Sequence, residues 1–137
     1  MIERKHRIED ALEAVKAAQE SGLVPGGGVA LIRAAAAARE SLSTENSHQQ
    51  IGAEIVFECI KAPLRQMAEN AGLSPDLIYS KVAELSQNEG CDIATGKIIN
   101  LVEGGIVDPA KVTITALQNA ISAASTLITT NNAIVET

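Results

Sequence analysis

Apolar residues recur at helical spacing along most of the chain and predict a mainly α-helical protein. In residues 2–20, Ile8, Leu12 and Val15 fall on one stripe at i, i+4 and i+7. Gly22 is placed to end this helix. The same spacing predicts helices over 28–42, 50–71 and 109–130, and another that starts at Ser74-Pro75.

Prolines and glycines divide this pattern into segments. Pro63 lies inside the predicted helix 50–71, and we expect a break or a kink there because proline removes a helix hydrogen bond. Ser74 and Asp108 each precede a proline and are predicted N-caps. Residues 86–108 lose the helical period and predict two short strands or extended pieces, and residues 133–135 are a candidate terminal strand. We therefore expect a helical bundle with one or two short β-strands.

The composition limits which residue types can form the core and which partners the chain can bind. Hydrophobic residues make up 46% of the 137 residues, yet the chain has one Phe, one Tyr and no Trp. The core must therefore consist of Ala, Ile, Leu and Val, which favours closely packed helices. A net charge of −6 argues against nucleic acid or an anionic membrane as a partner, because both attract a basic surface. No apolar run reaches the roughly 18 residues of a membrane span.

The N-terminus has charged residues but no apolar segment of a signal peptide, so we expect a cytoplasmic protein. Two cysteines predict no disulfide framework. Cys59 lies on the apolar stripe of the helix 50–71 and is expected to be a buried structural thiol. Histidines and cysteines lie too far apart in the sequence to suggest a metal site, and both His6 and His48 have polar neighbours typical of the surface.

A glycine turn between the first two helices is the first candidate for chemistry. Pro25 is followed by Gly26, Gly27 and Gly28, and the next helix starts at once. Glycines at the start of a helix leave free N–H groups and a positive dipole end, which suit an anion. The same residues also fit a tight connection between two helices, and the motif alone leaves both interpretations open.

Four segments, taken in order, resemble one family. They are residues 7–12 (RIEDAL), 22–31 (GLVPGGGVAL), 62–66 (APLRQ) and 105–113 (GIVDPAKVT). Together they are similar to the C-terminal part of a bacterial group I chaperonin (GroEL-type). The resemblance implies that residues 1–22 end the intermediate domain and that residues 23–137 form the second half of the equatorial ATP-binding domain. The apical domain, the first equatorial half with its Asp-Gly-Thr-Thr-Thr phosphate loop, and the Gly-Gly-Met tail are then expected outside this sequence. A start inside the first helix, with no N-cap before it, agrees with that expectation.

The resemblance also assigns roles to residues of a nucleotide site. Asp10 matches the catalytic aspartate that orients the water attacking the γ-phosphate, although a solvent-facing helix acid is the plainer interpretation. Asp108 matches the residue that binds the ribose hydroxyls, a role compatible with capping the last helix. The remaining matches are Gly26 and Gly27 beside the nucleotide, Ile106 as an apolar wall near adenine, and Asp92, Ile93 and Ala94 at the edge of the base.

The segment at the base departs from the family. Where the family has Tyr-Asn-Ala-Ala-Thr, this chain has Cys91-Asp92-Ile93-Ala94-Thr95. Backbone contacts to the base survive such a change. However, an amide that both donates and accepts has become a carboxylate that only accepts, which alters any side-chain contact.

Three functions follow as hypotheses. In the first, the chain is part of an ATP-dependent folding chaperonin that binds ATP or ADP with Mg²⁺. The metal ligands lie outside this chain, which by itself should lack ATPase activity. Such a protein forms a ring of identical subunits and engages unfolded polypeptides and a co-chaperonin through its other domains.

In the second hypothesis, the chain is a stand-alone helical interaction module without nucleotide chemistry. In the third, Asp10 and Asp108 form the acid–base pair of a small enzyme. If the chain is part of a chaperonin, the apolar surface that packs against the other equatorial half is uncovered here, and we expect it to drive self-association.

Overall fold

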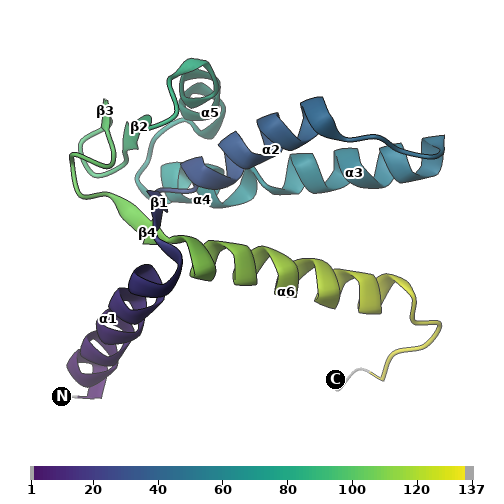
Figure 1. Ribbon diagram of the computed structural model, residues 1–137, viewed down its shortest axis with the longest axis horizontal. Helices are drawn as coiled ribbons and strands as arrows, with labels where there is room; N and C mark the ends of the chain where they lie inside the picture. Colours follow the sequence, from purple (N-terminus) through teal and green to yellow (C-terminus); the bar gives the residue numbers. More distant parts are fainter. Residues whose placement is uncertain (1, 135–137) are drawn as a thin grey trace. The chain divides into compact units, whose positions relative to one another are not determined.

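The computed structural model describes residues 2–134 and is mainly helical, as predicted. Figure 1 shows the helices and strands in chain order. They are α1 (Ile2–Ser21), β1 (Leu23–Pro25), α2 (Val29–Ser41), α3 (Ser47–Cys59), α4 (Ala62–Asn70), α5 (Pro75–Glu84), β2 (Glu89–Asp92), β3 (Lys97–Asn100), β4 (Val107–Pro109) and α6 (Ala110–Ile128).

The chain divides into two compact units. One comprises residues 23–108 and runs from β1 to the middle of β4. The other joins the two ends of the chain, residues 1–22 and 109–137, and is built from α1 and α6.

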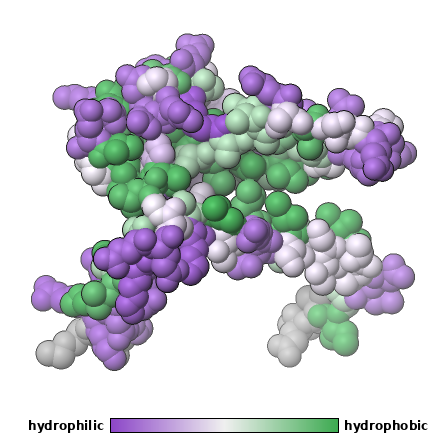
Figure 2. Space-filling model, viewed as in Figure 1, coloured by the Kyte–Doolittle hydropathy of each residue, from purple (hydrophilic) through white to green (hydrophobic). Residues whose placement is uncertain are grey.

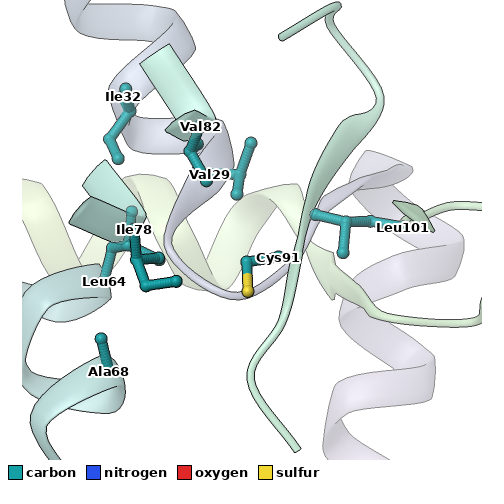
Figure 3. Close-up of a cluster of buried hydrophobic side chains, with 8 residues drawn as sticks. All are labelled: Val29, Ile32, Leu64, Ala68, Ile78, Val82, Cys91 and Leu101. Carbon is teal, nitrogen blue, oxygen red and sulfur yellow. The ribbon is translucent and has the colours of Figure 1, made fainter. Parts of the chain in front are cut away.

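The larger unit holds an aliphatic core, shown in Figure 3. Leu64 of α4 and Val82 of α5 are fully buried, as is Leu101 after β3. The core also contains Val29, Ile32, Ala68, Ile78 and Cys91, with Leu73, Tyr79, Ile93, Ile99 and Ile106 packed against it. Burial of one such aliphatic side chain stabilises the fold by about 1.5–3 kcal/mol. The predicted core of Ala, Ile, Leu and Val is thus confirmed for this unit except at Cys91, and the aromatic Tyr79 packs at its edge.

Within residues 2–134, two pairs of short strands accompany the helices. β2 and β3 form an antiparallel hairpin in which Glu89 lies opposite Asn100 and Asp92 lies opposite Lys97, in agreement with the two strands predicted between residues 86 and 108. β1 pairs with β4. β1 has no alternating apolar pattern and ends in proline, so its pairing was not predictable from periodicity.

The predicted helix 50–71 is two helices. α3 ends at Cys59 and α4 begins at Ala62, with Pro63 in its first turn. Proline is tolerated in that position because its missing N–H would have no partner there. The predicted break is confirmed, and it lies just before the proline rather than at it.

Several local predictions are wrong. Asp108 does not cap α6: the N-cap is Pro109, without a side-chain hydrogen bond, because β4 continues through Asp108. Ser74, in contrast, is the N-cap of α5 as predicted, although its side chain makes no capping hydrogen bond. Cys59 is exposed, and Cys91 is the buried thiol, since α3 turns its Cys59 stripe away from the core. Ala133 and Ile134 form no strand, and Val135 lies outside the described residues.

The smaller unit is held by contacts between the end of α1 and the start of α6. The Lys111 ammonium pairs with the Glu20 carboxylate. The backbone N–H of Lys111 donates to Ser21 Oγ at 2.9 Å, and the N–H of Ala110 donates to the carbonyl of Gly22 at 3.1 Å. Gly22 follows the last residue of α1, as predicted.

None of the described side chains of α1 and α6 is buried. Leu12 of α1 is 57% exposed and Val112 of α6 is 51% exposed, so the predicted apolar stripes exist but are not covered. Figure 2 shows hydrophobic residues at the surface over α3 and α6. Within residues 2–134, no helix combines the length and the hydropathy needed to cross a bilayer.

Candidate functional site

The glycine turn lies against the segment that leads into β4. The N–H of Gly26 donates to the carbonyl of Ile106 at 2.9 Å. A Cβ on Gly26 would lie 3.1 Å from the backbone carbon and oxygen of Ile106. A side chain at position 26 would therefore push the two backbone segments, which are distant in the sequence, apart by a few tenths of an ångström.

The next two glycines differ in what surrounds them. Gly27 and Gly28 have φ angles of +65° and +76°, and Gly28 is the N-cap of α2. A Cβ on Gly28 would lie 3.0 Å from the backbone nitrogen of Leu64, whereas a Cβ on Gly27 would meet no atom within 4 Å. Gly28 is thus confined by the core, while the backbone at Gly27 has an open side at the start of a helix. The sequence predicts an anion at this helix N-terminus, and that role stays a prediction.

Ile106 and Asp108 lie close together along the strand segment that the glycine turn contacts. Ile106 is half-buried against the core, and its N–H donates to the carbonyl of Leu101 at 2.8 Å. Asp108, in β4, is exposed. The structure therefore brings Gly26, Gly27, Ile106 and Asp108 together on two adjoining backbone segments.

Asp92 closes the tight turn between β2 and β3. Its Oδ1 accepts from the N–H of Ala94 at 3.0 Å, and its Oδ2 accepts from Thr95 Oγ1 at 2.7 Å. These bonds, with the one from Thr95 the largest contribution, lower the pKa of the Asp92 carboxyl. Both oxygens are therefore engaged within the turn. Asp92, which stands where the family pattern has Asn, thus fixes the shape of its own loop.

Ile93 and Ala94 lie on opposite sides of that turn. Ile93 packs against the core, and Ala94 is exposed. The exposed part of the turn consequently offers backbone groups rather than an apolar side chain. Thr95, which was not among the predicted site residues, locks the turn. An Asp followed by a hydroxyl residue three positions later is a signal of such a turn.

Asp10 belongs to the unit of α1 and α6. It is exposed in the middle of α1 and lines an open groove between the two helices. Charged groups of both signs share this groove: Glu13, Lys16, Glu20 and Lys111. The plainer interpretation of Asp10 as a solvent-facing acid describes its environment within this unit.

Residues 2–134 contain no group of three or more His, Cys, Asp or Glu side chains placed to hold a metal ion. Among the predicted site residues of the larger unit, Asp108 presents an exposed carboxylate and Ile106 a half-buried apolar side chain.

Comparison with known protein families shows to which family this chain belongs. The model of the TCP-1/cpn60 chaperonin family matches residues 1–137. The chain belongs to the TCP-1/cpn60 chaperonin family. This chaperonin chain is similar to an open-state monomer of a group II chaperonin from Methanococcoides burtonii, with 25% identity, a TM-score of 0.79, and coverage of 92% of this chain and 33% of that one. It is also similar to a group III chaperonin in the open state, with 33% identity, a TM-score of 0.72, and coverage of 86% of this chain and 25% of that one.

The chaperonin chain thus spans about a third and a quarter of the length of these two solved chains. These two solved chains are a group II and a group III chaperonin. The comparisons therefore confirm the chaperonin family and the fold, but they do not confirm the group I type that the sequence motifs predict.

Proposed function

We propose that this chain forms one wall of the nucleotide pocket of an ATP-dependent folding chaperonin of the bacterial group I type. A complementary polypeptide segment supplies the phosphate loop and the ligands of Mg²⁺. On this proposal, residues 1–22 end an intermediate domain and residues 23–137 form the second half of an equatorial domain. The complete protein acts in the cytoplasm as a ring of such subunits and binds unfolded polypeptides and a co-chaperonin through other domains.

The hydrogen bond from Gly26 to Ile106 is the observation that carries the proposal. It holds the glycine turn beside the strand with Asp108 and leaves the backbone at Gly27 open. Two features that bind different parts of a nucleotide are thereby adjacent. The N–H groups at the start of α2 suit a phosphate, and an exposed carboxylate accepts hydrogen bonds from ribose hydroxyls.

The other residues take roles that suit their surroundings. The half-buried Ile106 provides an apolar surface for adenine, and the exposed backbone of the Ile93-Ala94 turn reads the base edge. Asp92 acts through its turn, because both carboxylate oxygens are engaged there. Asp10, on α1, orients the water that attacks the γ-phosphate once the complete pocket is assembled, since a carboxylate beyond the terminal phosphate can hold that water and accept its proton.

A titration with fluorescently labelled ADP tests this function. The labelled nucleotide is added to this chain, and then to a mixture of this chain with the N-terminal half of a group I equatorial domain. We expect tight binding in the mixture and little binding to the chain by itself. Absence of binding in both samples would overturn the proposal.

Glycine variants give this titration a matched control. Gly27 and Gly72 both have positive φ angles, and a Cβ on either would meet no atom within 4 Å, but only Gly27 lies in the proposed site. Gly27→Ala and Gly72→Ala therefore impose a similar backbone cost. Only Gly27→Ala is expected to weaken ADP binding, because its methyl group would occupy the open side of the turn.

The second candidate is a helical interaction module, favoured by the apolar residues that α1, α3 and α6 expose. Light scattering and the ADP titration distinguish the two functions. Association of the chain without any nucleotide binding in the mixture would favour the interaction module.

A further inference from the structure

Arg33 joins α2 to the end of α5 in a way that the nucleotide motifs do not explain. Its guanidinium donates to three backbone carbonyls. The distances are 2.7 Å to Val82, 3.3 Å to Ala83 and 3.0 Å to Ser86. The last carbonyls of a helix lack partners and carry the negative end of its dipole, so a cation is favourable there.

The contact with Ser86 continues into β2. Ser86 donates to the Glu89 carboxylate through its N–H at 3.2 Å and through its Oγ at 2.7 Å. Its carbonyl, which Arg33 binds, also accepts from the N–H of Glu89 at 3.1 Å. Glu89 is the first residue of β2. Arg33 thus binds the loop that sets where this strand begins, and the strand leads to Asp92 and its turn.

Val29, which lies one helical turn before Arg33 on α2, forms a second connection between α2 and β2. A Cβ on Gly90 of β2 would lie 2.9 Å from Val29 Cγ2. Val29 is fully buried and directly follows Gly28 of the glycine turn. The glycine turn and the Asp92 turn are therefore connected through the first turns of α2, by Val29 at Gly90 and by Arg33 at the α5–β2 loop.

The position of Arg33 has an opposing cost. Arg33 is half-buried, and its Nε atom is buried without a hydrogen-bond partner among the described residues, which costs free energy. The three carbonyl contacts offset this cost, and they require the planar fork of a guanidinium. A lysine ammonium is a compact donor that cannot span the same three carbonyls.

We propose that Arg33 is a positioning residue that fixes the Asp92–Ala94 turn relative to the glycine turn, so that one nucleotide contacts both. The proposal rests on the nucleotide function proposed above. On this proposal, Arg33 affects which base the site prefers by holding the Asp92–Ala94 turn in place, and Arg33 itself does not contact the nucleotide.

The first test needs no nucleotide. Amide hydrogen exchange is measured at Ala94, Thr95 and Gly96 in the complete chain and in its Arg33→Gln and Arg33→Lys variants. Arg39→Gln is the control, because Arg39 lies on the same helix but contacts Glu54 and Phe57 of α3. We expect roughly tenfold faster exchange in Arg33→Gln, a smaller increase in Arg33→Lys, and none in Arg39→Gln. Equal exchange in all four proteins would overturn the proposal.

The second test separates positioning from general stability. In the mixture with the N-terminal equatorial half, affinities for ADP and for inosine diphosphate are compared, since these ligands differ at the base edge. We expect Arg33→Gln to reduce the preference between the two, with Arg33→Lys retaining part of it. A parallel loss of both affinities, with the preference unchanged, would contradict positioning. If the parent chain bound neither ligand, the proposed nucleotide function would fail, and the exchange measurement would still decide whether Arg33 fixes the turn.

Discussion

The two units of this chain use similar aliphatic residues in opposite ways. In the larger unit, side chains from α2, α4, α5 and the β2–β3 hairpin form one buried cluster. In the unit of α1 and α6, polar contacts join the helix ends while apolar side chains stay exposed. The difference teaches that an amphipathic pattern predicts a helix and its apolar face, whereas burial depends on what covers that face. Every residue of the proposed site except Asp10 comes from the unit with its own core.

Removal of a core side chain should give the largest effect and the sharpest contrast between the units. Leu64 is fully buried, whereas Leu127 of α6 is 71% exposed. Leu64→Ala should lower the free energy of unfolding by about 2–5 kcal/mol through lost burial and a new cavity. Leu127→Ala should change it by no more than about 0.5 kcal/mol. Urea denaturation of both variants measures this, and similar losses would contradict the division into one covered and one uncovered apolar surface.

The glycine turn should show the next largest effect. Gly28→Ala places a methyl group 3.0 Å from the Leu64 backbone, while Gly72→Ala has a similar positive φ and open space. We expect Gly28→Ala to cost about 1–3 kcal/mol and to exceed Gly72→Ala. Thermal unfolding of the two variants compares them directly. Equal costs would show that the close approach of Gly28 to the core carries no energy beyond its backbone conformation.

The Asp92 turn should weaken in acid. The pKa of Asp92 is lowered in the folded chain from the ordinary value of 3.8, chiefly by the hydrogen bond from Thr95. Its contribution to stability is therefore complete above pH 3.8 and is lost as the pH falls through the lower, folded pKa. Unfolding midpoints measured from about pH 6 to about pH 2 should fall less steeply in Asp92→Asn than in the parent chain. Parallel curves for the two proteins would show that the carboxylate does not stabilise this turn.

The smallest effect is expected in the unit of α1 and α6. Glu20 and Lys111 are exposed and pair across the helix ends, and their hydrogen bond lowers the pKa of Glu20 and raises that of Lys111. Exposed ion pairs contribute little and are screened by salt. Glu20→Gln should therefore slightly increase amide exchange at the start of α6 in low salt, and the increase should disappear in high salt. A large effect that persists in high salt would mean that this pair is a principal link between the helices.

Sequence patterns predicted the positions of the helices and strands better than they predicted which faces of them are buried. The break before Pro63, the end of α1 at Gly22 and the β2–β3 hairpin follow from local chemistry, which the sequence contains in full. The burial of Cys91 and the exposure of Cys59 depend on which face of each element meets the core, and periodicity does not specify that.

The candidate site shows the same limit. The turn at Gly26–Gly28 was predictable from its glycines, but its hydrogen bond to Ile106 joins residues 80 positions apart along the chain. Asp108 precedes a proline as an N-cap does, and only the pairing of β1 with β4 shows that it lies in a strand. Arg33 had no signal at all, because its partners are carbonyls of residues about 50 positions away.

Nuclear magnetic resonance mapping of ADP binding tests the central claim most directly. The isotopically labelled chain is mixed with the unlabelled N-terminal equatorial half, and ADP is added. We predict the largest shift changes at the backbone of Gly26, Gly27, Ile106 and Asp108, with the α3 residue Gly52 unchanged. Changes confined to α3 or α6, or no changes in the presence of saturating ADP, would contradict the proposed pocket.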